Sequence, residues 1–175
     1  MSLRILALCG SLRRASMNAA LLRAVARLAP AGSVVQLFIP SELPLFNPDL
    51  DTDMAWPPAV RRLRTAIDDC RAVLIASPEY AHGVTGVLKN ALDWLVSFEG
   101  FVGKPVAIFN ASPRSVHAAA SLREILVTMS ATLLTDACLD LPLRGTGPTE
   151  QGIIDTHGPA IRQALDRLIE GASQA

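Results

Sequence analysis

The chain has 175 residues, of which half are apolar and 18% are charged, and its 16 basic side chains balance its 16 acidic ones. This composition excludes a disordered chain, and the zero net charge argues against a basic nucleic-acid-binding face or a polybasic membrane segment. We therefore expect a single globular domain over residues 1–175 whose partners are neither nucleic acids nor membranes.

The cysteines and the N-terminal segment indicate the compartment. Cys9, Cys70 and Cys138 are widely spaced, and an odd number without a C-x-x-C motif argues against a disulfide framework and against a zinc site. No histidine has a carboxylate or cysteine at ligand spacing, so no metal site is expected. The apolar run after Arg4 has only five residues, too few for the core of a targeting signal. We expect a cytoplasmic protein without a membrane span.

Apolar runs that predict strands alternate along the chain with the apolar periodicity of helices. In chain order the expected elements are strand 3–8, helix 18–28, strand 34–39, helix 59–70, strand 72–77, helix 87–97, strand 105–110, helix 118–130, a strand within 132–141 and helix 161–169. Because the strands are apolar on both faces, the pattern indicates a parallel sheet covered by helices on both sides. The expected class is α/β: a flavodoxin-like doubly wound five-stranded parallel sheet of order 2-1-3-4-5.

Two features of this fold direct attention to particular segments. In doubly wound sheets, ligands bind beyond the carboxyl ends of the strands where the strand order reverses, here between strands 1 and 3. The loops to inspect are therefore 9–18, 77–86 and 110–117. The proline-rich segment 40–58 is long for a simple connection, so we expect it to be functional or part of an interface.

The first loop, CGSLRRASMN, has the composition of an anion anchor. The first N–H groups of a helix lack intrahelical acceptors, and the helix dipole favours an anion there. Two serines, an asparagine and an arginine add donors, and Gly10 is expected to permit a sharp turn. The spacing matches neither Walker A, nor G-x-G-x-x-G, nor the cysteine phosphatase loop, so we expect a phosphate that is held rather than attacked. The alternative is a serine-capped helix start with two solvated arginines.

The second loop opens the stretch SPEYAHGVTGVLKNALDW at residues 77–94. Pro78 stiffens the chain after the strand, Tyr80 offers a flat ring, and two glycines let the backbone approach a ligand closely. These features favour a flat heterocycle bound through backbone groups. The alternative is that Tyr80 only packs and the glycines only turn. Trp94 is expected in the core or in an interface.

Two motifs together carry a resemblance to a known family. G-S-x-R-x-x-S-x-N at residues 10–18 and S-P-E-Y-x5-G-x-L-K-N-A-x-D-W at residues 77–94 resemble the NADPH-dependent FMN reductase family, which includes quinone, chromate and azo-dye reductases. The resemblance covers residues 3–140 and includes L-P-L-F-N at residues 43–47. Either motif alone is weak, whereas both at the ligand-binding loops of the expected fold are specific.

The resemblance implies a bound FMN, with NADPH as reductant and a quinone-like or other small molecule as electron acceptor. NADPH would pass hydride to flavin N5, and the acceptor would leave reduced in a second, ping-pong step. Because the cofactor carries this chemistry, no side chain is singled out as a catalytic acid or base. By position in the motifs, the phosphate would be held by Ser11, Arg13, Ser16 and Asn18, and the isoalloxazine would be lined, largely through backbone groups, by Pro78, Glu79, Tyr80 and Gly83.

The third loop departs from the family pattern, because many relatives carry glycines there. Ser112 is still expected to contact the flavin. Arg114 would meet the 2′-phosphate of NADPH, or else is a surface arginine at a helix start. His82 would tune the flavin or protonate a product, or else faces solvent or a neighbouring subunit.

The resemblance also implies homodimers or homotetramers, with segment 40–58 and the end of the helix that carries Trp94 in the interface. Two other functions remain open at this point. A flavodoxin-type electron carrier would bind FMN without oxidising NAD(P)H, although such carriers are usually strongly acidic. A flavin-free regulatory domain would keep the fold alone.

Overall fold

The computed structural model of the chain describes residues 2–52, 54–143 and 149–174. Its strands are β1 (Leu3–Cys9), β2 (Ser33–Phe38), β3 (Ala72–Ala76), β4 (Glu79–Tyr80), β5 (Gly83–Val84), β6 (Pro105–Asn110), β7 (Thr132–Leu133) and β8 (Leu139–Asp140). Its α-helices are α1 (Met17–Arg27), α2 (Pro58–Asp69), α3 (Gly86–Asp93), α4 (Val116–Thr128) and α5 (Glu150–Gln174). All five expected helices are present, and α3 and α5 differ most from the predicted bounds.

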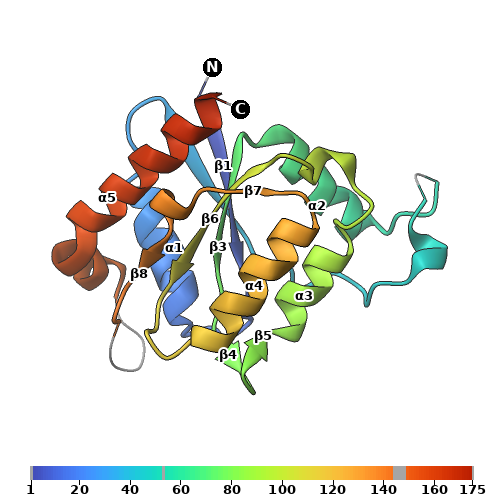
Figure 1. The fold of residues 1–175 in the computed structure, drawn as a ribbon, viewed down its shortest axis with the longest axis horizontal. Coiled ribbons are helices and arrows are strands. Elements are labelled where there is room, and N and C mark those ends of the chain that lie inside the picture. The colour runs from blue at the N-terminus through green and yellow to red at the C-terminus, as the bar shows by residue number, and fades with distance from the viewer. Residues whose placement is uncertain (1, 53, 144–148, 175) are drawn as a thin grey trace.

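The main sheet has the expected strand order. β2, β1, β3, β6 and β7 lie side by side and pair in parallel, and β8 also pairs with β6. The prediction of order 2-1-3-4-5 is therefore confirmed (Figure 1). The strand order reverses between β1 and β3, where Cys9 lies opposite Ala76 at the carboxyl ends of both strands. The loops that follow these two strands therefore meet at the switch point of the sheet.

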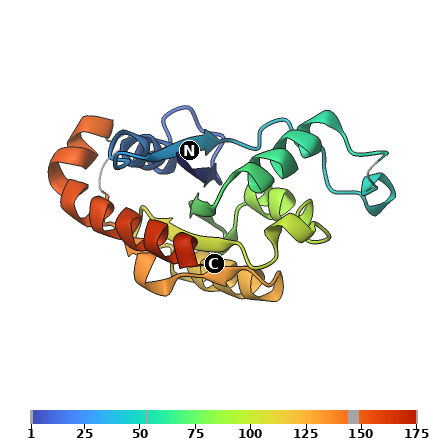
Figure 2. The same ribbon diagram turned by 90° about the horizontal axis from the view of Figure 1, so that it is seen from above.

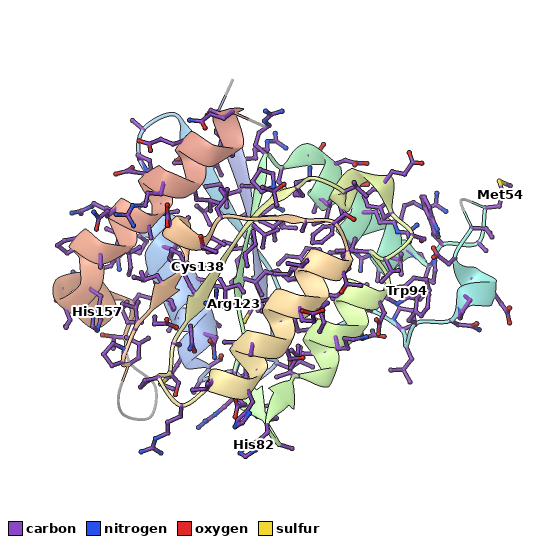
Figure 3. All side chains as sticks on the ribbon, in the orientation of Figure 1. Met54, His82, Trp94, Arg123, Cys138 and His157 are labelled. Atoms are coloured by element: carbon purple, nitrogen blue, oxygen red, sulfur yellow. The ribbon has the colours of Figure 1, made fainter. Side chains whose placement is uncertain are left out.

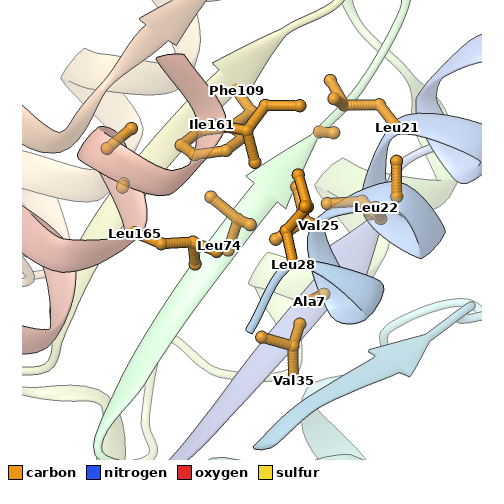
Figure 4. Close-up of a cluster of buried hydrophobic side chains, with 14 of the residues drawn as sticks. Ala7, Leu21, Leu22, Val25, Leu28, Val35, Leu74, Phe109, Ile161 and Leu165 are labelled. Atoms are coloured by element: carbon orange, nitrogen blue, oxygen red, sulfur yellow. The ribbon is translucent and has the colours of Figure 1, made fainter. Parts of the chain in front are cut away.

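Alternation along the central strands produces two hydrophobic cores. In β1, Ile5 and Ala7 belong to a core shared with α1 and α5, whereas Leu6 and Leu8 belong to a second core shared with α2, α3 and α4. Figure 2 shows the helices on the two faces, and Figure 4 shows the first core, where α1 and α5 meet over β3 and β6. The doubly wound arrangement follows from strands that are apolar on both faces.

Two short strands replace the strand expected within 132–141. β7 pairs with the start of β6 and β8 with its end, and a 3-10 turn at Thr135–Ala137 lies between them. Six positions separate Leu133 from Leu139, whereas their partners in β6 are three positions apart. The additional residues between Leu133 and Leu139 do not pair with β6 and form a bulge between the two short strands. A run of apolar residues cannot reveal such a bulge, because it predicts burial rather than register.

The last helix is much longer than the predicted helix 161–169. It begins at Glu150 and continues through Pro159, whose missing N–H normally marks a helix boundary. Residues on both sides of this proline, including Ile153 and Leu168, pack into the first core, so tertiary burial overrides the local signal. In the described part of the chain, no helix, α5 included, has the length and apolar character needed to cross a membrane.

Residues 40–52 and 54–57, here called the projecting segment, reach away from the body of the molecule between β2 and α2 (Figures 1 and 2). The base of this segment docks on α3 and on the turn that follows it. Asn90 Oδ1 accepts a hydrogen bond from Phe46 N–H at 2.8 Å, and Trp94 Nε1–H donates to Pro44 O at 2.8 Å. Trp94 is fully buried, which confirms its expected place in the core.

A buried ion pair also holds the projecting segment. Arg64 of α2 donates to Asp51 Oδ1 at 2.7 Å, and both side chains are at least nine-tenths buried. The guanidinium also donates to the carbonyl of Trp94 at 2.7 Å and to Ser97 Oγ at 3.1 Å. It lies over the ring of Trp56, with 4.3 Å from the guanidinium carbon to the ring centroid. The projecting segment is therefore held against α2 and the end of α3 by the hydrogen bonds and the ion pair of the Arg64 guanidinium, and not by apolar contact alone.

Candidate functional site

The three loops expected to form the site converge on one pocket. The pocket has a volume of about 250 Å³ and takes residues from the start of α1, from the segment after β3 and from the loop after β6. Four of the nine sequence-predicted residues line it: Asn18, Pro78, Glu79 and Ser112. The other lining residues are Met17, Ser77, Ala111 and Ser115, which the prediction left out, and Arg114, which it offered as a contact of the NADPH 2′-phosphate or as a surface arginine. Ser11, Arg13, Ser16, Tyr80 and Gly83 lie on the same loops but do not line this pocket.

The start of α1 has the geometry of an anion anchor. Ser16 is the N-cap residue, and its hydroxyl accepts from Ala19 N–H at 3.2 Å. Ser11 Oγ accepts from Arg13 N–H at 3.4 Å, which folds the loop back on itself. Within the described residues, the N–H groups of Met17 and Asn18 have no acceptor. These are two of the orphan donors that make a helix N-terminus an anion site.

Asn18 offers a more specific indication that the loop accommodates a ligand. Its side chain is buried, and its Oδ1 is the one buried side-chain polar atom without a hydrogen-bond partner in the described part of the chain. A buried acceptor left unpaired costs free energy, so such atoms are uncommon in folded proteins. The same residue lines the pocket. Hydroxyl groups of a ribityl chain are donors of the kind this oxygen lacks, and the residues present therefore fit FMN.

Gly10 is needed for close packing rather than for the sharp turn that the sequence predicted. Gly10 does not have a positive φ. Among the described glycines, positive φ occurs at Gly32 and Gly103. A Cβ at position 10 would lie 2.2 Å from Ser77 Oγ, so a larger residue would collide with the loop after β3. Thr85 Oγ1 donates to the carbonyl of Gly10 at 2.8 Å. The first and second loops are therefore packed directly against each other.

The loop after β3 contains a small hairpin that the sequence did not predict. β4 and β5 pair antiparallel through Glu79–Val84 and Tyr80–Gly83, and two residues form the turn. Ala81 has φ of 48° and His82 has φ of 56°. Two-residue turns with positive φ at both positions usually carry Asn-Gly, because most side chains are unfavourable in this conformation. Alanine and histidine are not typical of this turn, so the sequence predicts an ordinary loop here and no hairpin.

The strain in this turn leads to a stability prediction. Replacing Ala81 with asparagine is expected to raise the free energy of unfolding by about 0.5–1 kcal/mol, because asparagine tolerates the left-handed conformation that costs alanine about 1–2 kcal/mol. Chemical denaturation measures the change. The matched control is Ala120→Asn on the exposed face of α4, where loss of helix propensity should lower stability by about 0.5 kcal/mol. Equal effects of both substitutions would contradict the strain at position 81.

Glu79 joins the hairpin to α4. Its Oε2 accepts a hydrogen bond from Ala118 N–H at 2.9 Å. The side chain of the N-cap residue normally accepts the hydrogen bond from this third N–H group of a helix. Ser115, the N-cap residue of α4, makes no such side-chain bond. The Glu79 carboxylate is therefore committed to the helix, which agrees with the expectation that this stretch meets a ligand largely through its backbone. Tyr80 is 58% exposed, so its ring is available beside the pocket rather than packed in the core.

The third loop is ordered by side-chain bonds to its own backbone. Asn110 Oδ1 accepts from Ser112 N–H at 3.1 Å, and Ser112 Oγ accepts from Arg114 N–H at 3.3 Å. These two turns replace the glycines that the family pattern led us to look for. They place Ser112 and Arg114 on the wall of the pocket.

The two histidines nearest the pocket meet each other. His82 at the tip of the hairpin stacks on His117 of α4, with ring centroids 4.3 Å apart and 17° between the planes. Both side chains are exposed. They are 35 positions apart in the chain, and no spacing rule could have paired them.

Cys9 does not have the character of a nucleophile. Burial raises the pKa of its thiol, and a hydrogen bond with the Ser11 backbone and the charge of Arg23 only partly oppose this effect. A raised pKa keeps the sulfur protonated at neutral pH, whereas a phosphatase loop requires the thiolate. No cluster of three or more metal-ligating side chains is found among the described residues.

The fold and the placement of the pocket define the class of the protein. A doubly wound parallel sheet with its pocket at the switch point is the flavodoxin-like arrangement. Its fold is close to that of FerB, a flavoenzyme NAD(P)H:(acceptor) oxidoreductase from Paracoccus denitrificans, with a TM-score of 0.83 over 98% of this chain and 97% of the other at 24% identity.

Sequence comparison gives the family. The sequence model of the NADPH-dependent FMN reductase family matches residues 3–141. An NAD(P)H-dependent FMN reductase of Pseudomonas aeruginosa is 42% identical over 63% of this chain, and a quinone reductase of Escherichia coli K12 is 35% identical over 75% of it. The matched part spans 60% of the Pseudomonas protein and 73% of the Escherichia protein. The chain belongs to the NADPH-dependent FMN reductase family.

Proposed function

We propose that the protein is an FMN-dependent NAD(P)H oxidoreductase, built as one domain, that reduces quinone-like or other small acceptors. The observation that carries the proposal is the convergence of three loops on one pocket, beside a helix N-terminus with free donors and the unpaired Oδ1 of Asn18. Membership of the family supports FMN as the ligand and NADPH as the reductant. The names of the relatives support quinones as acceptors.

The residues divide into an anchor for phosphate and a wall for the ring. Arg13 supplies the fixed positive charge near the start of α1, and Ser11, Ser16 and Asn18 supply hydroxyl and amide groups. Pro78, Glu79, Tyr80, Gly83 and Ser112 would line the isoalloxazine. When bound, FMN supplies the redox chemistry, because it takes hydride from a reduced nicotinamide and gives its electrons to the acceptor.

The protein's own contribution is position and electrostatics rather than proton transfer. The hydrogen bonds of Glu79 to α4 and of Ser112 within the third loop hold two sides of the pocket in fixed places. Preorganised donors at α1 hold the anionic end of the cofactor without reorganisation. Arg114 at the pocket wall offers a fixed cation for the 2′-phosphate of NADPH. These groups act before and after the redox step, and none has to gain or lose a proton.

We propose that the protein forms homodimers or homotetramers through the projecting segment. Leu45 and Met54 on that segment are 84% and 94% exposed, and Figure 3 shows Met54 at its far end. Exposed apolar side chains on a firmly anchored projection are typical of an interface. A second copy of this chain is the expected partner, and sedimentation of the wild type and of Leu45→Asp measures it. A monomeric wild type would contradict the proposal.

Steady-state turnover tests the proposed activity. FMN-loaded protein is expected to consume NADPH when a soluble quinone or ferricyanide is present, and the initial rates should follow a ping-pong pattern. The flavin-loaded protein without acceptor is the control for slow oxidation by oxygen. Failure to consume either NADPH or NADH with both acceptors would contradict the proposal.

A further inference from the structure

The β4–β5 hairpin depends on contacts outside itself. Each of its strands has two residues, and Ala81 and His82 occupy the unfavourable left-handed region. An isolated two-stranded hairpin is marginally stable at best, and this turn lowers its stability further. Thr85 ties its base to the first loop, and Glu79 ties its first strand to α4. Val84 of its second strand packs against the second core, and at the tip His82 stacks on His117.

This stack joins two imidazole side chains. Imidazole groups in proteins generally take up a proton between about pH 5 and pH 8. Neutral imidazole rings stack favourably, whereas two imidazolium ions at a centroid distance of 4.3 Å repel each other. His117 is the second residue of α4, where the helix dipole disfavours a cation. Double protonation therefore opposes the stacked arrangement.

Other charged groups near the pair do not cancel this repulsion. On the hairpin, the Glu79 carboxylate is engaged with Ala118 N–H. Arg114, on the loop that leads into α4, adds positive charge, and Arg123 and Glu124 lie farther along the helix. On α3, into which the hairpin leads, Lys89 pairs with Asp93 at 2.5 Å.

We propose that the His82–His117 pair is a proton-sensitive latch that holds the hairpin against α4 and thereby sets the affinity of the pocket for flavin. Pro78, which precedes the hairpin, and Glu79, its first residue, form one wall of the pocket. The hydrogen bond from Ala118 N–H to Glu79 also supports that wall, and release of the tip removes a second support, so flavin binding weakens when both rings carry a proton. The effect on flavin rests on the proposed function, whereas the latch itself is a property of the chain alone.

Proton NMR of the flavin-free protein tests the latch without any ligand. The chain has three histidines, and Figure 3 shows His157 on α5, far from His82. At about pH 8, the ring signals of His82 and His117 are expected to be displaced from that of His157 by each other's ring current. The displacement should disappear by about pH 5.5. Signals at the position of His157 throughout would overturn the stack and the latch.

Flavin affinity tests the consequence for the pocket. The phosphate of FMN itself takes up a proton near pH 6, so the wild type must be compared with variants rather than with itself. His117→Phe keeps a flat ring that a protonated His82 can still contact through a cation–π interaction. Between about pH 8 and pH 5.5, the dissociation constant for FMN is expected to rise at least fivefold more in the wild type than in His117→Phe. His157→Phe is the matched control and should behave as the wild type does.

A second variant tests the latch in case His117→Phe does not fold. His82→Asn keeps the left-handed turn but removes the ring, so its affinity at pH 8 should already be weakened and its pH dependence should match that of His117→Phe. Equal pH dependence of the wild type and both variants would overturn the latch. Absence of FMN binding at pH 8 in the wild type would instead overturn the proposed function, and the NMR result would then decide the latch alone.

Discussion

Replacing Arg64 with alanine is expected to lower the free energy of unfolding by about 3–5 kcal/mol. The side chain is buried, and its removal leaves the Asp51 carboxylate without its ionic partner in a site that is 9% exposed. It also removes the donors to Trp94 O and Ser97 Oγ. Since domains are stable by only about 5–15 kcal/mol, this is a large part of the total. Urea denaturation monitored by circular dichroism measures it.

Arg62→Ala is the matched control, because Arg62 lies on the same helix and also forms an ion pair. Its partner is Glu42, and both side chains are more than half exposed. Exposed pairs contribute about 0–1 kcal/mol, so the control should lose at most that amount. Equal losses in the two variants would show that Arg64 does not hold a buried charge.

The same pair predicts a pH dependence. Burial alone would raise the pKa of Asp51, but the hydrogen bond from Ser97 and the charge of Arg64 outweigh burial, and the pKa lies below its ordinary value. The unfolded chain therefore binds the proton more readily, and the pair's stabilisation is present above the unfolded value of about 3.9. It is lost as the pH falls through the folded value. The stability difference between the wild type and Arg64→Ala should accordingly shrink below about pH 4.

The second large effect is expected at the phosphate anchor. Arg13→Ala should weaken FMN binding by about 10- to 100-fold, because a charge-assisted hydrogen bond contributes about 1.5–3 kcal/mol. Riboflavin has no phosphate, so its affinity should be unchanged in the same variant. Flavin fluorescence quenching gives both dissociation constants, and their ratio isolates the phosphate contact from any general loosening of the pocket.

Arg14→Ala is the control for this prediction. Arg14 is the next residue of the same exposed loop but occupies an unspecified position of the motif, so only a weak, salt-screened effect of less than about threefold is expected. Ser16→Ala would be a poorer test, because Ser16 also caps α1 and its loss would destabilise the helix. Parallel losses for FMN and riboflavin in Arg13→Ala would place the phosphate elsewhere.

The parts of the fold that the sequence predicted share a local origin. Strand β1 and the apolar stripes of α2 and α4 depend on patterns within about a dozen residues, and the structure has them as expected. The serine cap at the start of α1, which the sequence offered only as the alternative to a phosphate anchor, is also present. The strand order followed from alternation of strands and helices, and it was confirmed. Asn18 was identified from a motif, whereas its burial and its unpaired oxygen required the fold.

The parts that the sequence missed depend on long-range contact. The Ala81–His82 turn carries no turn residue and is held by contacts with Gly10 and α4. Arg64 lies among other arginines of α2 and reads as part of a solvated face, yet the projecting segment covers it. Pro159 marks a helix end locally, but packing on the first core carries α5 through it. In each case tertiary burial outweighs local propensity.

Anaerobic mixing of the FMN-loaded protein with NADPH is the most direct test of the proposed flavin site. The oxidised flavin absorption band is expected to bleach rapidly and to return when a quinone is added. Arg13→Ala, loaded to the same flavin occupancy, should bleach as well, because the phosphate anchor binds the cofactor but takes no part in the redox step. A bound flavin that stays oxidised with both NADPH and NADH would contradict the proposed oxidoreductase and would favour an electron carrier.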